Sequence, residues 1–286
     1  MKNFFKNLSK NSEPYLIAEI GINHNGDMKI AKKLIDATNA CDWHCVKLQK
    51  RNPDVCVPEH QKSKMRSTPW GEMTYLDYKY KVEFEKNEYD AIDLYCKQKN
   101  LPWTASVWDI DSLYFIKEYD IPFIKIPSAH LTNIELINES AKSGIPVLIS
   151  TGMSTWKIVD SAVETLEQGN ADYAILHCIS TYPAPHKELN LNIIPAMKDR
   201  YNCVIGYSGH EHDLEPSVLA VALGAEILER HVTLDHNMWG TDHNSSLEVH
   251  AMDILKKRLK GVKSMLGDKD KKITDSEKLV MKKLRG

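Results

Sequence analysis

Two histidines that each follow a short apolar run are the residues of this sequence best suited to hold a metal ion. His210 comes after the strand-like run Cys203 to Tyr207, and His231 comes after Ala225 to Leu228. The helix-like segment Pro216 to Leu223 lies between them, which makes a βαβ unit. Because parallel neighbouring strands end at the same edge of a sheet, the two imidazoles should lie side by side. The pair favours an open site for a divalent transition metal, whereas either histidine alone is more simply a hydrogen-bonded polar residue.

Two lysines at the ends of other expected strands indicate a pocket for an anion. Lys47 and Lys125 would be costly to bury in a barrel mouth unless an anion met them. Three serine hydroxyls lie at equivalent places: Ser128, Ser150 and Ser208. These donors together suit a phosphate or a carboxylate. Each lysine taken singly is equally well explained by an internal salt bridge to Glu19 or Glu229.

The elements that must position these residues are eight short apolar runs separated by helix-like segments. Strands are expected at Tyr15 to Ile20, His44 to Gln49, Pro102 to Ser106, Phe123 to Ile126, Pro146 to Ser150, Tyr173 to Cys178, Cys203 to Tyr207 and Ala225 to Glu229. Helices are expected at Lys29 to Ala40, Asn87 to Gln98, Ile110 to Glu118, Asn133 to Ser143, Thr155 to Gln168, Ile193 to Arg200, Glu215 to Leu223 and Glu248 to Leu266. This alternation predicts an α/β fold, a closed (β/α)8 TIM barrel over residues 1–268, with an open doubly wound sheet as the alternative.

Two segments fall outside the repeat. Lys50 to Glu85, which holds Arg51, Arg66 and Trp70, is too long for an ordinary βα loop and is expected to be functional or a lid. Residues 269–286 form an expected helical tail. That tail either packs across the barrel or a partner subunit, or stays solvated.

The composition excludes several classes of protein. A net charge of -2 and a pI near 6.6 give no basic surface for nucleic acid or an anionic membrane. The six cysteines contain no C-x-x-C pair, which is typical of free thiols in a reducing compartment. The sequence has no run of eighteen apolar residues and no start typical of a signal peptide. We therefore expect a soluble, cytoplasmic protein that acts on small molecules.

A metal, an anion pocket and spare carboxylates permit several reactions. Metal-assisted hydrolysis, isomerisation of a sugar phosphate and aldol-type condensation with an enolate donor all fit the residues. A lysine Schiff base is a further option, because crowding by Lys47 would depress the pKa of Lys125. The residues alone leave this choice open.

Eight short strings, in order along most of the chain, resemble the sialic acid synthase (N-acetylneuraminate synthase) family, which includes legionaminic and pseudaminic acid synthases. They are Ile17 to Gly26, Val46 to Gln49, Lys125 to Ser128, Ser150 to Met153, Leu176 to Cys178, Gly206 to His210, Glu229 to His231 and Gly240 to His243. The resemblance implies a barrel enzyme that condenses phosphoenolpyruvate with an open-chain N-acylated amino sugar of the N-acetylmannosamine type. The products would be a nine-carbon 2-keto sugar acid and phosphate.

The resemblance also implies roles for individual residues. His210 and His231 match ligands of Mn²⁺, with Mg²⁺ or Co²⁺ as other candidate ions. The phosphoenolpyruvate contacts fall on Lys47, Lys125, Ser128, Ser150 and Ser208. Positions that face the sugar or a metal-bound water fall on Glu19, Gln49, Ser106, Tyr182 and Asp242, and Ser180 is expected to bind substrate as well. Glu19 or Asp242 would position or deprotonate the water, and the family expectation is a homodimer.

Three departures from the family pattern bear on the sugar pocket. His130 stands where the sialic acid branch has an acidic residue, and Ser180 stands where it has an asparagine. The resemblance also leads us to expect a short form without the C-terminal antifreeze-like domain that lends an arginine to the neighbouring subunit's site in many members. Our hypothesis is that Arg51 or Arg66 takes the place of that arginine.

Two readings compete with the condensing enzyme. The first is a barrel that binds a sugar or phosphate without catalysis, and the second is a metal-dependent hydrolase or sugar-phosphate isomerase. Release of phosphate from phosphoenolpyruvate in the presence of an acylamino sugar distinguishes the enzyme from both.

Overall fold

Eight parallel strands form the wall of a barrel, with β1 hydrogen-bonded to β10 to close it. We analysed a computed structural model, which describes residues 3–8 and 13–285. The barrel strands are β1 Tyr15–Gly21, β2 Cys45–Lys50, β5 Trp103–Val107, β6 Ile124–Ile126, β7 Val147–Ser150, β8 Tyr173–Cys178, β9 Val204–Gly209 and β10 Ile227–Thr233. A short strand, β11 Leu247–Glu248, extends the sheet beside β10. The prediction of a closed (β/α)8 barrel is confirmed, with every expected strand present.

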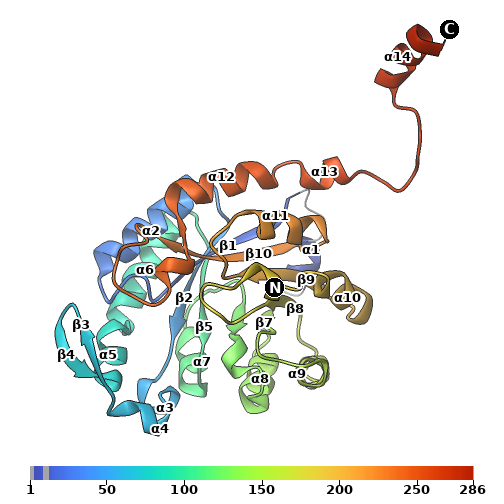
Figure 1. The fold of residues 1–286 in the computed structure, drawn as a ribbon. Coiled ribbons are helices and arrows are strands. Elements are labelled where there is room, and N and C mark those ends of the chain that lie inside the picture. The colour runs from blue at the N-terminus through green and yellow to red at the C-terminus, as the bar shows by residue number, and fades with distance from the viewer. Residues whose placement is uncertain (1–2, 9–12, 286) are drawn as a thin grey trace.

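Helices cover the outside of the barrel (Figure 1). Those that connect or follow barrel strands are α2 Met28–Ala40, α6 Lys86–Gln98, α7 Ile110–Ile116, α8 Ile134–Lys142, α9 Trp156–Gln168, α10 Ile193–Arg200, α11 Glu215–Ala222 and α12 Val249–Leu259. Side-chain caps set the start of several of them. Asp109 accepts the backbone N–H of Ser112, and Asn133 accepts that of Leu136. The expected helix Glu248 to Leu266 is interrupted at Gly261, whose positive φ of 83° ends one helix before α13 Val262–Leu266 begins.

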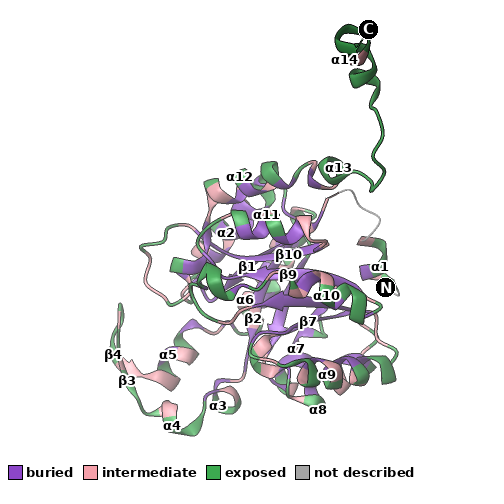
Figure 2. Cartoon of the chain, turned by 45° about the vertical axis from the view of Figure 1, so that its right-hand side comes forward, coloured by how far each residue is buried: buried purple, intermediate pink, exposed green. Residues whose placement is uncertain are grey.

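Two hydrophobic cores hold the barrel together. The larger lies between the strands and the surrounding helices, so the strands are buried on both faces (Figure 2). The smaller lies inside the barrel, where Phe5 of α1 Phe4–Leu8 packs against Phe123 with ring centroids 5.8 Å apart. Phe5 thus closes the end of the barrel at which the strands begin. The opposite end, where the strands finish, carries the polar residues.

The long connection between β2 and α6 is folded rather than irregular. It contains α3 Pro53–Cys56, α4 Glu59–Lys62, an antiparallel hairpin of β3 Met65–Thr68 and β4 Gly71–Thr74, and α5 Tyr75–Val82. We call residues 65–82 the rim segment. A small cluster of Ile22, Tyr78 and Val82 fixes it to the rest of the molecule, with Trp239 packed against this cluster. The hairpin itself projects from the body of the molecule (Figure 1).

The C-terminal tail is helical but makes little contact with the barrel. Helix α14 Asp275–Arg285 has no buried residue and stands away from α12 and α13 (Figure 1). Three short 3-10 turns, η1 Ser128–His130, η2 His186–Glu188 and η3 His243–Ser245, complete the elements of the described residues. Within the described residues, no helix is both long and apolar enough to cross a bilayer. All six cysteines are free thiols, of which Cys56 and Cys203 are half-buried and the others buried.

Candidate active site

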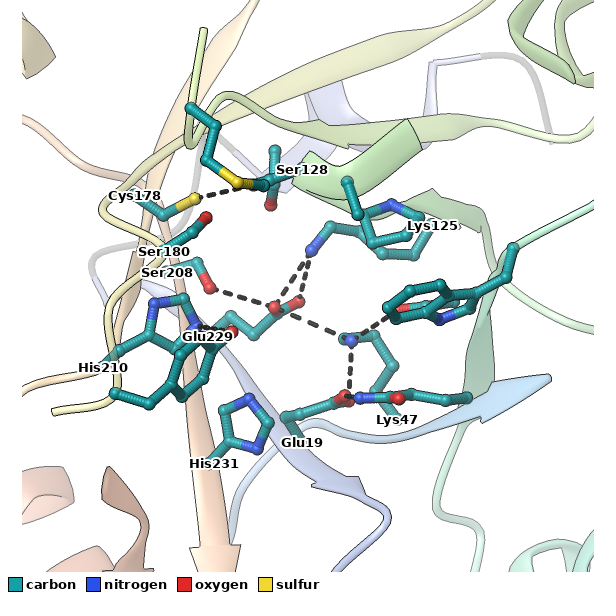
Figure 3. A pocket seen from close by; sticks show the side chains of 18 residues that line it. Glu19, Lys47, Lys125, Ser128, Cys178, Ser180, Ser208, His210, Glu229 and His231 are labelled. Atoms are coloured by element: carbon teal, nitrogen blue, oxygen red, sulfur yellow. Dashed lines mark hydrogen bonds and ion pairs between the residues drawn. The ribbon is translucent and has the colours of Figure 1, made fainter. Parts of the chain in front are cut away.

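Two lysines and two glutamates form a buried network at the bottom of a pocket in the barrel mouth (Figure 3). The Nζ atom of Lys47 lies 2.6 Å from Glu19 Oε2 and 3.7 Å from Glu229 Oε1. Lys125 Nζ lies 3.0 and 3.1 Å from the two carboxylate oxygens of Glu229. Strand register explains the arrangement, because Glu19 on β1 is aligned with Lys47 on β2 and with His231 on β10. We call these four charged residues the pocket floor.

The environment of the pocket floor separates the pKa values of its two carboxyl groups. Burial alone would raise the pKa of Glu229, but Lys125 and Lys47 outweigh it and hold that pKa at about 2. Burial raises the pKa of Glu19, and Lys47 only partly opposes the effect. Burial likewise lowers the pKa of Lys125, with Glu229 acting against it and Lys47 adding to it. Two carboxyl groups with diverging pKa values are a typical arrangement for proton transfer, with Glu19 the one that protonates more readily.

Hydroxyl groups surround the charged network. Lys47 donates to Ser106 Oγ at 2.8 Å, and Ser208 donates to Glu229 at 3.0 Å. On the opposite wall, the Gly152 N–H donates to Ser128 Oγ at 3.0 Å. A Cβ atom at Gly152 would come within 2.9 Å of this same oxygen, so a larger residue there would displace the Ser128 side chain. The buried Ser150 Oγ has no hydrogen-bond partner among the described residues, so it is free to donate to an anion.

The two histidines meet at the pocket edge with ring centroids 5.5 Å apart. His210 Nδ1 donates to the Ile179 carbonyl at 2.7 Å, which leaves the lone pair on Nε2. The Tyr182 hydroxyl lies 3.0 Å from Nε2 and donates to that lone pair. Burial and the nearby His231 lower the pKa of His210 to about 3, so the ring is neutral at physiological pH.

His231 is the less constrained of the two rings. Its buried Nδ1 makes no hydrogen bond within the described part of the chain, and it lies 3.9 Å from Asp242 Oδ2. Burial lowers the pKa of His231 to about 4, although Asp242 acts in the opposite direction. Two neutral imidazoles with an available nitrogen each are the donor type that a borderline transition-metal ion prefers. Among the described residues, no group of three His, Cys, Asp or Glu side chains is arranged to hold a metal.

Residues 34–271, most of the chain, match the NeuB family. The chain belongs to the NeuB family. It is 40% identical to N-acetylneuraminate-9-phosphate synthase of Drosophila melanogaster, over 84% of this chain and 66% of the fly protein. It is 33% identical to N,N'-diacetyllegionaminic acid synthase of Campylobacter jejuni, over 92% of this chain and 80% of that protein.

A solved structure resembles this NeuB-family chain over nearly its whole length. It is the N-acetylneuraminic acid (sialic acid) synthetase of Leptospira borgpetersenii, with a TM-score of 0.86 and 29% sequence identity. The superposition covers 96% of this chain and 93% of the synthetase. The family resemblance read from the eight strings is thereby confirmed.

The fold brings nearly all the predicted site residues of this NeuB-family chain to one pocket. The predicted residues that line it are Glu19, Lys47, Gln49, Ser106, Lys125, Ser128, Ser150, Ser180, Ser208, Tyr182, His210 and His231. Asp242 lies just outside this lining, beside His231. Their chemical roles stay predictions. The two interpretations of Lys47 and Lys125, an internal salt bridge and an anion pocket, are compatible. The lysines form internal salt bridges and also line the pocket.

Six residues that line the pocket were not among the predicted site residues: Glu229, which was expected only as a salt-bridge partner, Pro127, Ala129, Trp108, Met153 and Cys178. Trp108 follows β5 directly, Met153 follows Gly152, and Cys178 ends β8. The Cys178 thiol lies 3.0 Å from Ser128 Oγ. Trp108, Met153 and Cys178 received no site role because a search for polar strand ends gives no weight to aromatic or sulfur side chains, although Met153 and Cys178 lie in two of the eight strings. Their place directly at or after a strand end was the available signal.

Of the two arginines proposed to substitute for a cap-domain arginine, Arg51 lies against the pocket and Arg66 lies on the rim segment. Arg51 donates to Gln49 and lies over the Trp108 ring, 4.4 Å from its centroid. Its Nε atom is 3.4 Å from Glu83 Oε2. Arg51 is therefore tied to two pocket residues, and its charge is already balanced by an acid.

A second buried ion pair lies next to both histidines in the chain. Arg230 and Glu211 are completely buried and lie 3.0 Å apart. Each is the chain neighbour of one of the histidines. Arg230 also donates to the hydroxyl of Ser217 at 2.8 Å, and Tyr207 donates to Glu211 at 2.9 Å. This pair fixes the ends of β9 and β10 relative to each other.

Proposed function

We propose that this chain condenses phosphoenolpyruvate with an open-chain N-acylated amino sugar, giving a nine-carbon 2-keto sugar acid and phosphate. The observation that carries the proposal is the pocket floor, where two lysines and several hydroxyls face the same space as two neutral histidines. Membership of the NeuB family supports it, because the named relatives are synthases of sialic and legionaminic acids.

In this proposal the lysine side of the pocket binds phosphoenolpyruvate. Lys47 and Lys125 supply positive charge, and the hydroxyls of Ser128 and Ser150 supply hydrogen-bond donors. Glu19 and Glu229 neutralise the lysines before the substrate arrives. The raised pKa of Glu19 makes this carboxylate a better proton acceptor than Glu229.

The histidine side would hold a divalent ion, which we propose to be Mn²⁺. The fit rests on two neutral imidazoles, on the unpartnered Nδ1 of His231 and on the lone pair of His210 Nε2. The Tyr182 hydroxyl donates to that lone pair, so this side chain has to turn aside before an ion can bind there. Tyr182 is 44% exposed. Substrate and water oxygens would complete the ligand set. When bound, the ion would supply Lewis-acid polarisation of the sugar aldehyde.

The reaction then needs one proton acceptor. The methylene carbon of phosphoenolpyruvate attacks the aldehyde carbon, whose oxygen takes up a proton. Water adds to the resulting cationic carbon and loses a proton, and the C–O bond to phosphate then breaks as the keto group forms. We assign removal of the water proton to Glu19 rather than to Asp242. Glu19 lies in the pocket floor beside Lys47, whereas Asp242 lies outside the pocket lining.

The test is phosphate release from phosphoenolpyruvate with Mn²⁺ and a panel of N-acylated mannosamine-type sugars, followed by the mass of the product. We expect sugar-dependent phosphate release and a product whose mass equals sugar plus pyruvate. Release without a sugar would indicate a hydrolase, and no release with any sugar would favour a binding protein. We also propose that two copies associate, which sedimentation analysis checks.

A further inference from the structure

We propose that Arg51 is a positioning residue for the reaction: it fixes the side-chain amide of Gln49, and Gln49 in turn fixes the carboxylate of Glu19. The inference rests on the proposed function, in which Glu19 accepts a proton from water. It gives Arg51 a role different from that of a cap-domain arginine, because Arg51 acts through its neighbours rather than on the substrate. Glu19 belongs to β1 and Gln49 to the adjacent β2, which Arg51 directly follows.

The hydrogen bonds of Gln49 leave its amide only one orientation. Gln49 Nε2 donates to Glu19 Oε1 at 2.9 Å, and Gln49 Oε1 accepts from the Arg51 guanidinium. An arginine can only donate hydrogen bonds, and an ionised carboxylate can only accept them. A flipped amide would point its oxygen at Glu19 and its NH2 group at Arg51, so both hydrogen bonds would be lost. Arg51 thus determines which end of the Gln49 amide faces Glu19.

Arg51 is itself held in place by groups outside the pocket floor. Its side chain is buried, and its Nε atom lies 3.4 Å from Glu83 Oε2. Its backbone N–H donates to Glu83 Oε1 at 3.0 Å, and its guanidinium lies 4.4 Å from the centroid of the Trp108 ring. A planar guanidinium can hold an acid with one nitrogen and an amide with another, whereas the ammonium of lysine has a single nitrogen.

The carboxylate of Glu19 has little freedom once Gln49 is fixed. Its Oε2 atom lies 2.6 Å from Lys47 Nζ, and its Oε1 atom accepts from Gln49. A Cβ atom at Gly21 would come within 3.1 Å of Gln49 Nε2 and 3.2 Å of Glu19 Oε1, so the space beside this hydrogen bond is already filled. Loss of Arg51 would release the amide, and with it one of the groups that hold Glu19. Because a proton acceptor has to keep its geometry towards the water, this loss should act on the rate.

The first experiment measures Gln49 directly by NMR, without substrate or metal. The chain is labelled with nitrogen-labelled glutamine, and the side-chain signal of Gln49 is assigned by its loss in Gln49→Met. In the native chain the side-chain amide protons of Gln49 should exchange with water more slowly than those of the exposed Gln98. Arg51→Met should remove this protection. Native protection of Gln49 in Arg51→Met would contradict the inference.

The second experiment is the phosphate-release assay with phosphoenolpyruvate, Mn²⁺ and an N-acylated mannosamine-type sugar. Arg51→Met should lower kcat about 10- to 100-fold, because misplacing a reacting group by about 1 Å costs on the order of 100-fold. The KM for phosphoenolpyruvate should stay native, because the lysines of the pocket floor are unchanged. In a Gln49→Met background, the same substitution should cause no further loss of kcat, because its target is already gone. Losses that multiply would show that Arg51 acts independently of Gln49.

The matched control is Lys50→Met. Lys50 is also buried and lies 3.3 Å from Glu83, but its ammonium donates to the Phe84 carbonyl and not to Gln49. Arg51→Met and Lys50→Met each leave Glu83 with one cation, so neither variant leaves this buried acid unpaired. Lys50→Met should keep the native protection of Gln49 and the native kcat. Equal losses in the two variants would show that Arg51 acts only through Glu83 on the fold.

Arg51→Lys asks the same question with the charge beside Glu83 retained. Its single nitrogen cannot hold both Glu83 and Gln49, so the protection of Gln49 should fall as in Arg51→Met. Native protection together with native kcat in Arg51→Lys would contradict the inference. No phosphate release by the native chain with any sugar of the panel would contradict the proposed function, and the role of Arg51 in the reaction with it. The exchange measurement would then still decide whether Arg51 fixes Gln49.

Discussion

The floor and the rim of the pocket are both rich in positive charge, but they differ in how that charge is balanced. In the floor, Lys47 and Lys125 lie 2.6 and 3.0 Å from Glu19 and Glu229, and all four side chains are almost fully buried. On the rim, Arg66 and Lys79 lie against tyrosine rings, and no carboxylate in the described part of the chain forms an ion pair with either. A buried lysine requires a counter-ion within the fold because it has lost its hydration. A half-exposed cation is still hydrated, so it is stable without a counter-ion. The charges of the floor are thus paired within the fold, whereas those of the rim are balanced only by solvent and aromatic rings.

The largest effect should follow from removing a cation of the floor. Lys125→Met leaves Glu229 buried with only Lys47, at 3.7 Å, as a cationic partner. We expect a loss of about 3 to 5 kcal/mol in the free energy of unfolding. Activity should fall about 100- to 1,000-fold, the scale for one lost electrostatic contact to the reacting group. Urea unfolding and the phosphate-release assay measure the two quantities.

The double variant Lys125→Met/Glu229→Met separates these two effects. It removes both partners, so stability should recover towards the native value. Activity should stay low, because the anion has still lost its lysine. Recovery of activity together with stability would show that Lys125 acts only on folding.

A smaller but still large effect should follow from changing the histidine side. His210→Gln and His231→Gln should each weaken binding of Mn²⁺ at least about 100-fold, because each removes a proposed ligand, and loss of supporting contacts alone costs about 10- to 100-fold. Calorimetric titration of Mn²⁺ measures this without turnover. His250→Gln is the matched control, because His250 is exposed and lies on α12. Native affinity for Mn²⁺ in all three variants would contradict a metal site at these two histidines.

The attachment of the rim segment can be tested through one glycine. A Cβ atom at Gly26 would collide with the Lys81 carbonyl oxygen at the end of α5, and its φ is 71°. Gly26→Ala should therefore destabilise the protein by about 1 to 3 kcal/mol more than backbone strain alone and raise KM for the sugar. Gly144→Ala supplies the comparison, since Gly144 has a φ of 75° and nothing within 4 Å of the added atom. Equal losses in unfolding free energy for Gly26→Ala and Gly144→Ala would show that the rim segment moves away from the added Cβ atom without cost.

The smallest effect at neutral pH concerns His24, which stacks on Phe84 beneath the rim segment at 3.9 Å between centroids. Burial and the charge of Arg51 lower the pKa of His24 from 6.5 to about 3. Below pH 6.5 the unfolded chain binds a proton that the folded chain refuses, so stability falls as the pH drops towards about 3. The contribution of His24 is about 1.4 kcal/mol for each pH unit within that window. Urea unfolding at several pH values should give a shallower slope for His24→Gln, and an identical slope would contradict the assignment.

The barrel and its floor could be predicted from the sequence because both follow from local rules. Short apolar runs that alternate with amphipathic segments specify the strands, and residues such as Lys47 and His231 come at the ends of those runs. The rim segment could not be predicted in the same way. Its hairpin is too exposed and too short to leave an alternating pattern, and α5 becomes fixed only through contacts of Tyr78 with distant residues such as Trp239.

The pairing of charges also lay beyond the sequence. Whether Lys125 is met by an internal acid or faces an open pocket depends on distances of a few ångströms between strands. The structure shows both at once. Trp108 and Cys178 were missed for a different reason. Aromatic and thiol side chains are not typical of an anion pocket, although the positions of these residues at strand ends indicated one.

The most direct test of the account is the mass of the product formed from phosphoenolpyruvate, Mn²⁺ and an N-acylated mannosamine-type sugar. We expect one new 2-keto acid whose mass is that of the sugar plus pyruvate, formed in equal amount to the phosphate released. Pyruvate and unchanged sugar as the products, or no phosphate with any sugar of the panel, would contradict the proposed carbon–carbon bond formation.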